Sequence, residues 1–108
     1  MAKIDLIIEN NVAGSTTDLT ETAIIPNGMS VRLSLFGGCN PSLTPGSFFA
    51  LQWGDGVSWQ TIRAGCNQFE YNLNRDFESD GTNRFRLVRF NADASAKKMV
   101  AWLEGFTI

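Results

Sequence analysis

The segment from residue 48 to residue 63 constrains the fold most, because it predicts a β-hairpin around a Gly-Asp-Gly turn. Its apolar and polar residues alternate with the period of two that a strand requires. We place Gly54, Asp55 and Gly56 in a three-residue loop, since Gly56 can adopt the left-handed conformation that such loops need. A two-residue Asp55-Gly56 turn would instead scatter the tryptophans over both faces of the hairpin. The favoured register directs one set of side chains into the core: Phe49, Leu51, Trp53, Val57, Trp59 and Thr61.

Alternation of the same kind recurs along the rest of the chain and predicts about eight strands with no helical periodicity. The Gly- and Pro-rich segment 37–46 and the polar segment 74–83 are predicted to be loops. In the strand that ends at Phe36, four residues are predicted to point inward: Met29, Val31, Leu33 and Leu35. The fold class is all-β, an antiparallel two-sheet sandwich in a single domain spanning 1–108. A jelly-roll-like form of the sandwich and a small barrel both stay open, and terminal strands that are apolar on both faces favour the sandwich.

Charge is distributed unevenly along the chain. Arg32 is the only charged side chain between Thr22 and Trp53, although the whole chain has a net charge of −2. Two interpretations of this segment remain open: strands covered by uncharged polar residues, and a subunit interface, where charge is depleted. The acidic net charge predicts no nucleic-acid partner.

The amino-acid composition excludes most of the common catalytic groups. The chain has no histidine and two cysteines, so Ser-His and Cys-His nucleophiles cannot form and zinc lacks ligands. We expect no enzyme, no cofactor and no metal. Cys39 and Cys66 are expected to be buried thiols, with a disulfide between them left open. The amino terminus has acidic residues within its apolar stretch, which predicts a strand and no signal peptide. No run reaches transmembrane length, so we expect no membrane partner.

One loop resembles the start of a calcium site. Residues 76–83 place oxygen ligands at alternate positions before Gly81, as in an EF-hand. The twelfth position of that pattern is Leu87, where a bidentate Glu is required. We therefore interpret the segment as a solvated hairpin connection.

Two interaction hypotheses follow from these observations. The first is a non-enzymatic structural protein that assembles with itself, with a trimer favoured. The first strand, residues 3–10, is then the candidate for pairing with a neighbouring subunit, because edge strands must be paired or protected. The candidate interaction residues are Ile4, Leu6, Ile8, Arg32, Asp55, Arg84 and Arg86. The alternative is a carbohydrate-binding module that uses aromatic rings near Trp53 and Trp59, with Asp55 beside them. Cross-strand ion pairing is the simpler explanation for Arg84 and Arg86.

The closing strands, residues 85–90 and 99–106, resemble the end of small β-sandwich virion proteins of tailed bacteriophages. The resemblance covers about the last quarter of the chain and carries no functional motif, so no site residues are transferred. It implies a capsid-decorating, head-fibre or tail-associated protein that is often trimeric. It also implies assembly in the host cytoplasm, incorporation into the virion, and capsid or tail proteins as partners.

Overall fold

The computed structural model describes residues 3–40 and 44–108, and the regular structure in these residues is β-strand throughout. This confirms the all-β class predicted from the alternation. The strands are β1 (Lys3–Ile8), β2 (Asn11–Val12), β3 (Thr16–Glu21), β4 (Ser30–Cys39), β5 (Phe48–Gly54), β6 (Trp59–Gly65), β7 (Gln68–Glu78), β8 (Arg84–Asn91), β9 (Lys97–Lys98) and β10 (Val100–Thr107).

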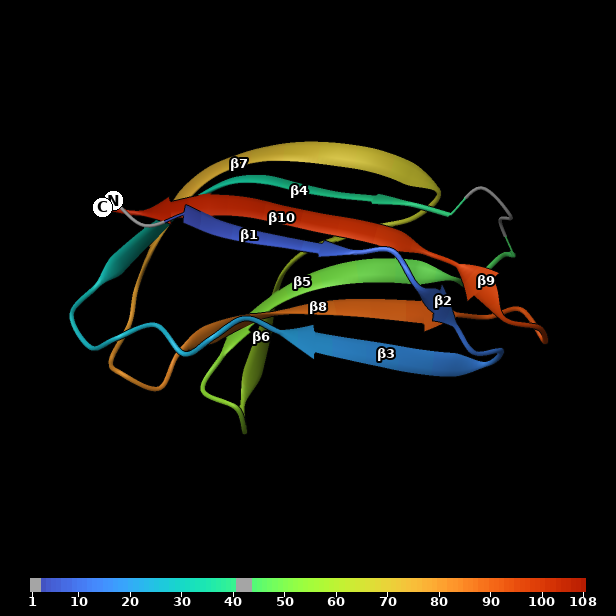
Figure 1. Ribbon diagram of the computed structural model, residues 1–108, viewed down its shortest axis with the longest axis horizontal. Coiled ribbons are helices and arrows are strands. Elements are labelled where there is room, and N and C mark those ends of the chain that lie inside the picture. Colours follow the sequence, from blue (N-terminus) through green and yellow to red (C-terminus); the bar gives the residue numbers. More distant parts are fainter. Residues whose placement is uncertain (1–2, 41–43) are drawn as a thin grey trace.

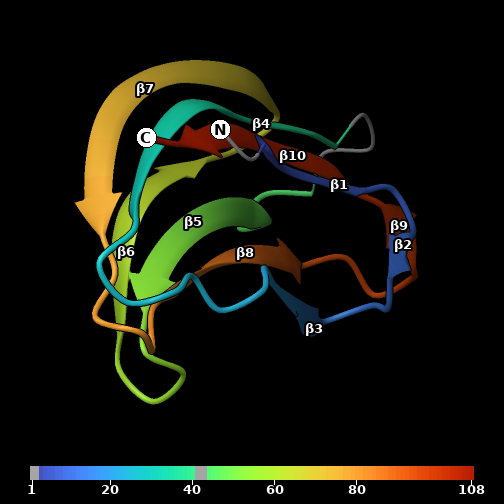
Figure 2. The same cartoon turned by 60° about the vertical axis from the view of Figure 1, so that its left-hand side comes forward.

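The longer strands form two antiparallel sheets that face each other, which confirms the predicted two-sheet sandwich (Figure 1). Sheet I has the order β1-β10-β4-β7, and sheet II has the order β3-β8-β5-β6. Figure 1 draws sheet I above sheet II. In the turned view, β6 and β7 lie on one side of the sandwich, and β2 and β9 lie on the other (Figure 2).

The long strands are paired in a nested order. Leaving aside the two-residue strands β2 and β9, β1 pairs with β10, β3 with β8, β4 with β7, and β5 with β6. Two further contacts, β10 with β4 and β8 with β5, join these pairs into sheets. The chain therefore crosses repeatedly between the layers, and most contacts join residues that are far apart in sequence.

The core lies between the sheets and is rich in aromatic rings. Phe69 of sheet I packs edge-on against Phe49 of sheet II, with ring centroids 5.5 Å apart. Trp53 contacts Phe85 at 4.6 Å and Phe77 at 5.1 Å. Rings in these tilted and edge-on arrangements stabilise a core beyond the area that they bury.

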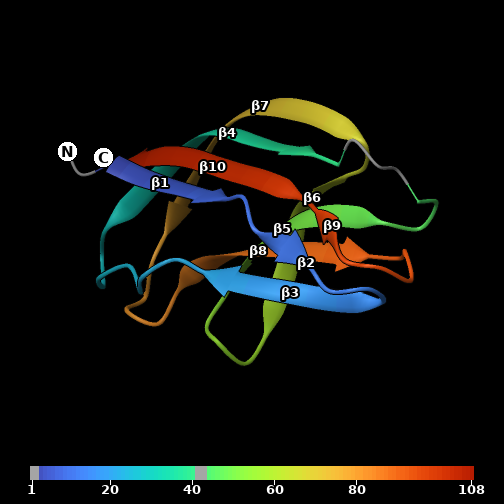
Figure 3. The ribbon, with the colours of Figure 1, turned by 45° about the vertical axis from the view of Figure 1, so that its right-hand side comes forward.

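A buried arginine fixes the side of the sandwich where β2 and β9 cross between the sheets (Figure 3). The Arg89 side chain is 1% exposed and lies on the inward face of β8. It donates to the backbone oxygens of Asn10 (2.9 Å) and Met99 (2.7 Å), to Asn10 Oδ1 (2.8 Å), and twice to Asp18 Oδ2 (3.2 and 2.7 Å). These bonds match the five donors of a guanidinium, so one buried cation joins the ends of β1 and β10 to sheet II.

Asn91 and Asp93, which follow Arg89 in the sequence, also form hydrogen bonds near β2 and β9. Asn91 is fully buried and donates to the backbone oxygens of Val12 and Ser95, each at 3.0 Å. Asp93 accepts from Ser95 Oγ (2.6 Å), Ser95 N (3.0 Å) and Thr44 Oγ1 (2.9 Å). The bonds from Ser95 and Thr44 stabilise the ionised carboxylate and lower the pKa of Asp93 from 3.8 to about 2.

The predicted loop at 37–46 is wrong in its first part, because β4 continues through Gly37 and Gly38 to Cys39. Aromatic rings from neighbouring strands fill the space beside these glycines: the Trp102 indole lies where a side chain at Gly37 would be, and the Phe69 ring lies where one at Gly38 would be. A bulge between Leu33 and Leu35 then reverses the alternation. Phe36 is buried as a result, while Leu35 lies on the outer face, contrary to the prediction.

The predicted hairpin register is also wrong. Gly54 pairs with Trp59 and Trp53 pairs with Gln60, so the loop has four residues, 55–58. The Asp55 carboxylate accepts the N–H groups of Val57 (2.8 Å) and Ser58 (2.7 Å), which stabilises the longer turn. Trp53 therefore points into the core, while Trp59 lies on the outer face. Val57 is 89% exposed, where the prediction placed it in the core.

The two cysteines are both free thiols. Cys39 is half-buried and Cys66 is exposed, so the expectation of two buried thiols is wrong for Cys66.

We expect Arg89→Met to lower the free energy of unfolding by about 3–5 kcal/mol, because the change leaves buried acceptors without their donor. The measurement is urea unfolding followed by tryptophan fluorescence. Arg63→Met is the matched control, since Arg63 is exposed and its guanidinium lies 4.0 Å from the Tyr71 ring. Its expected loss is under about 1 kcal/mol. Equal losses in the two variants would contradict the role assigned to Arg89.

We expect Asp93→Asn to change how stability depends on pH. The folded-state pKa of Asp93 is lowered from 3.8 to about 2, so its contribution to stability is present above pH 4 and disappears between pH 4 and pH 2. The variant should therefore unfold at lower urea than wild type at pH 7, and the difference should shrink as the pH falls to 2. Urea midpoints at pH 7, 4 and 2.5 measure this, and a constant difference would argue against it.

Candidate functional site

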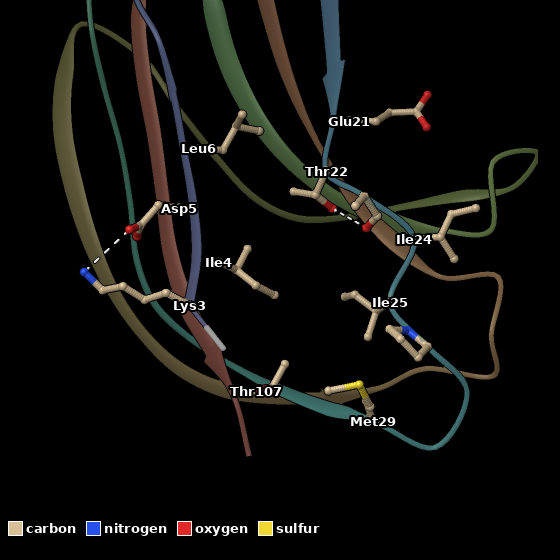
Figure 4. Close-up of a pocket in the computed structure, with 12 residues that line it drawn as sticks. Lys3, Ile4, Asp5, Leu6, Glu21, Thr22, Ile24, Ile25, Met29 and Thr107 are labelled. Atoms are coloured by element: carbon tan, nitrogen blue, oxygen red, sulfur yellow. Dashed lines mark hydrogen bonds and ion pairs between the residues drawn. The ribbon is translucent and has the colours of Figure 1, made fainter. Parts of the chain in front are cut away.

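An apolar groove lies at the edge of the sandwich between β1 and the segment that follows β3 (Figure 4). Its volume is about 530 Å³. Ile4 and Leu6 of β1 form one wall and Ile25 forms the other, with Met29 at the base and Ile24 at the outer rim. The groove exists because β2 and β9 close only the far half of this side, so the edges of the two sheets stay apart here (Figure 1).

Local sequence explains how each wall forms. Alternation in β1 turns Ile4, Leu6 and Ile8 toward the core, where all three are partly buried. On the other wall, Thr22 N donates to Phe85 O and Ile25 N donates to Asn83 O, both at 2.8 Å. These bonds hold the segment after β3 extended beside β8. Ile25 is therefore 4% exposed, while Ile24 points outward and is 53% exposed.

The charges around the groove are paired locally. Lys3 Nζ lies 3.5 Å from Asp5 Oδ2. On the opposite wall, Glu21 Oε1 accepts from Arg84 Nε at 2.7 Å. The groove therefore presents an apolar centre with a rim whose charges already have partners.

The tip of the β5–β6 hairpin is the second prominent surface feature. Gly56 has a positive φ of 96°, and the Arg84 guanidinium occupies the space where a side chain at Gly56 would lie. Bonds from the N–H groups of Ser58 and Val57 lower the pKa of Asp55 below its usual value, so its carboxylate stays ionised at neutral pH. The tip is thus a fixed turn that presents Val57 to solvent.

The outer face of sheet II beside the tip carries an aromatic and basic cluster. The Arg86 guanidinium lies 4.0 Å from the centre of the Trp59 ring, and Arg86 Nε donates to Gln52 Oε1 at 2.8 Å. Trp53 is on the opposite face of the sheet, against Phe77 and Phe85. The two tryptophans therefore do not form a common platform on which a sugar could stack.

The structure brings most of the candidate interaction residues into two places. Ile4 and Leu6 line the groove, while Asp55, Arg84 and Arg86 lie at or beside the hairpin tip. Ile8 lies at the other end of β1 and packs against the core. Arg32 is on the outer face of sheet I, where Nε and Nη2 donate to the two carboxylate oxygens of Asp76 at 2.7 and 3.0 Å.

The predicted loop at 74–83 is wrong in its first part, because β7 continues to Glu78 and only residues 79–83 form the connection to β8. Asp76 lies in β7 and pairs with Arg32. Asp80 Oδ1 accepts from Thr82 N (2.9 Å) and Thr82 Oγ1 (2.6 Å). Within residues 3–40 and 44–108, no group of three or more His, Cys, Asp or Glu side chains is placed to hold a metal ion. In the same part of the chain, no helix is long and apolar enough to cross a membrane.

Sequence reasoning missed Arg89 and the exposure of Val57. The signal for Arg89 was available, because it shares the alternation of Phe85, Leu87 and Asn91, all of which are buried. Val57 had no such signal, since its position depends on side-chain bonds within the turn.

We expect Gly56→Ala to destabilise the protein more than Gly28→Ala does. Both glycines have positive φ, which costs an L-residue about 1 kcal/mol or more. Only at Gly56 would the new methyl group displace Arg84, because the space at Gly28 is open. Thermal unfolding of both variants measures the difference, and equal losses would show that Arg84 does not brace the tip.

The comparisons with known proteins give a likeness at the level of the fold. No protein-family model matches the chain, and no curated protein matches it in sequence. A crystal structure described as a pentameric capsid protein isolated from metagenomic phage sequences is similar to it, with a TM-score of 0.52 and 12% identity over 92% of this chain. A second structure of that description has a TM-score of 0.44 and 13% identity over 92%. The chain spans 59% and 60% of those chains. The resemblance to phage virion proteins is therefore confirmed for the fold.

Proposed function

We propose that this chain is a structural component of a phage virion that assembles into a closed homo-oligomer. The observation that carries the proposal is the likeness of its fold to a phage capsid protein over 92% of the chain. A shared fold does not by itself assign a function. The apolar groove adds an independent reason, because contiguous exposed apolar surface with a polar rim is typical of a protein interface.

The nested strand order supports the same assignment. Pairing of β1 with β10, β3 with β8, β4 with β7 and β5 with β6 is the connectivity that we assign to a jelly roll. Jelly rolls form viral capsid domains and also lectin domains. No described feature favours the lectin function, since Trp53 is in the core and Trp59 has Arg86 over its ring.

For the oligomer, we propose a pentamer in place of the trimer predicted from the sequence. The structures with a similar fold are described as pentameric, and the comparisons offer no support for a trimer. The chain would act without enzymatic activity, within the virion, in contact with itself and with other capsid or tail proteins. Candidate contact residues are those of the hairpin tip and of the groove, including Ile4 and Leu6 of β1.

Light scattering coupled to size-exclusion chromatography tests the assembly. We expect one mass, that of five chains, that stays constant over a hundredfold range of protein concentration. A single-chain mass throughout that range would contradict self-assembly. Point changes are preferable to deletion of β1 here, because Ile4, Leu6 and Ile8 pack against the core and their removal would disturb the fold.

Purified phage particles test the location. We expect mass spectrometry to detect the chain in particles after a high-salt wash, in a constant ratio to the major capsid protein. Loss of the chain from washed particles, or its absence from them, would refute the virion assignment even if the isolated protein were oligomeric.

A further inference from the structure

We propose that the groove between β1 and the segment after β3 receives the β5–β6 hairpin tip of a second copy of this chain, with Val57 entering the groove. This proposal rests on the proposed self-assembly and names the surfaces that carry it. It assigns a role to two features, the groove and the exposed valine, that the fold of one chain does not use.

The shape of the groove determines what can occupy it. A concave apolar surface is filled only by a convex one, so two grooves cannot cover each other. The described residues include six large hydrophobic side chains that are markedly exposed: Ile7, Leu19, Ile24, Phe48, Val57 and Ile108. Five of these six side chains do not stand at the end of a loop that projects from the sandwich. Ile24 lines the groove itself, Ile7 and Leu19 lie within strands, and Phe48 stacks on Phe90 at 5.5 Å. The backbone of Ile108 is bonded to β4, since its N–H donates to Ser30 O at 2.9 Å.

Val57 is the remaining side chain, and it is also the most exposed of the six, at 89%. It stands at the end of a hairpin that extends away from the body of the molecule (Figures 1 and 2). An apolar side chain at the end of a projection is in contact with water in the single chain. Its transfer into an apolar groove is favourable for the same reason that forms a core.

The tip is fixed in advance of any contact. Asp55 holds the N–H groups of Val57 and Ser58, and Arg84 lies against Gly56 while paired with Glu21. A turn that is already ordered loses little conformational entropy when it binds. This distinguishes the tip from an ordinary surface loop and makes it suitable for insertion.

The charges of both surfaces are compatible with burial of the centre. At the groove, Lys3 is paired with Asp5, and Glu21 is paired with Arg84. At the tip, the carboxylate of Asp55 is satisfied by backbone N–H groups. An apolar centre within a rim of satisfied polar groups is the usual composition of a protein interface.

The contact joins two different surfaces, so it closes either as a two-fold dimer, in which two copies exchange tips, or as a larger ring. A tip-to-groove contact that continues in one direction generates a ring if the rotation between copies closes. The proposed pentamer would be such a ring, in which every subunit gives one tip and receives another.

Two charge variants test the contact in the full-length chain. Val57→Asp and Ile24→Asp should each convert the oligomer to single chains in light scattering. Ile7→Asp, on the outer face of β1, is the control and should leave the mass unchanged. Because all three side chains are exposed, their melting temperatures should stay close to that of wild type. An assembled Val57→Asp or Ile24→Asp protein would overturn the tip-to-groove contact.

A cysteine pair tests whether the two surfaces meet. In a Cys39→Ser, Cys66→Ser background, a chain carrying Val57→Cys and Ile24→Cys should form covalent multimers on mild oxidation. A chain carrying Val57→Cys and Ile7→Cys should not. Multimers from both pairs, or from neither, would overturn the proposal. If wild type is a single chain at every concentration, the proposed self-assembly fails as well. If wild type assembles and the variants behave unlike these expectations, only the tip-to-groove contact fails.

Discussion

The buried guanidinium of Arg89 determines how the two sheets are joined. A charge without solvent is costly unless its donors are all satisfied, and here its hydrogen bonds go to Asn10, Asp18 and Met99. Asn10 lies between β1 and β2, Asp18 lies in β3, and Met99 lies between β9 and β10. One side chain of sheet II therefore binds two of the connections that cross to sheet I, those that contain β2 and β9. Because β2 and β9 pair over only two residues each, the bonds of Arg89 reinforce a short backbone ladder at this crossing.

The position of these polar bonds explains why the sandwich is closed near β2 and β9 and has a groove beside β1. Arg89, Asn91 and Asp93 all act near β2 and β9, where polar groups bind the crossing segments. At the other half, no side-chain hydrogen bond or ion pair joins the described residues of β1 to the segment after β3, and the groove lies between them. The groove is thus a consequence of where the polar connections stop.

Alternation in the sequence predicts the strands and the layers well, because burial on one face of a sheet imposes a period of two. The prediction from alternation fails where a bulge shifts the period, or where a side chain from another strand fills the space beside a glycine. Gly37 and Gly38 look like a loop, yet the rings of Trp102 and Phe69 supply the missing side-chain volume and the strand continues. The bulge near Leu35 reverses the face of the residues that follow. Such effects depend on partners distant in sequence. Arg89 is different, since its alternation with Phe85 and Leu87 already indicated an inward side chain.

The largest error in the sequence analysis lies at the surface that the functional proposal uses. A three-residue loop would have placed Trp53, Val57 and Trp59 together in the core. The carboxylate of Asp55 stabilises a longer turn instead, which separates the tryptophans and leaves Val57 in water. Exposure of an apolar side chain on a braced turn gives the single chain nothing in return. The bonds of Asp55 and Arg84 stabilise the turn in the single chain, and they also hold Val57 in a fixed position, from which it can enter the apolar groove of an identical chain as proposed.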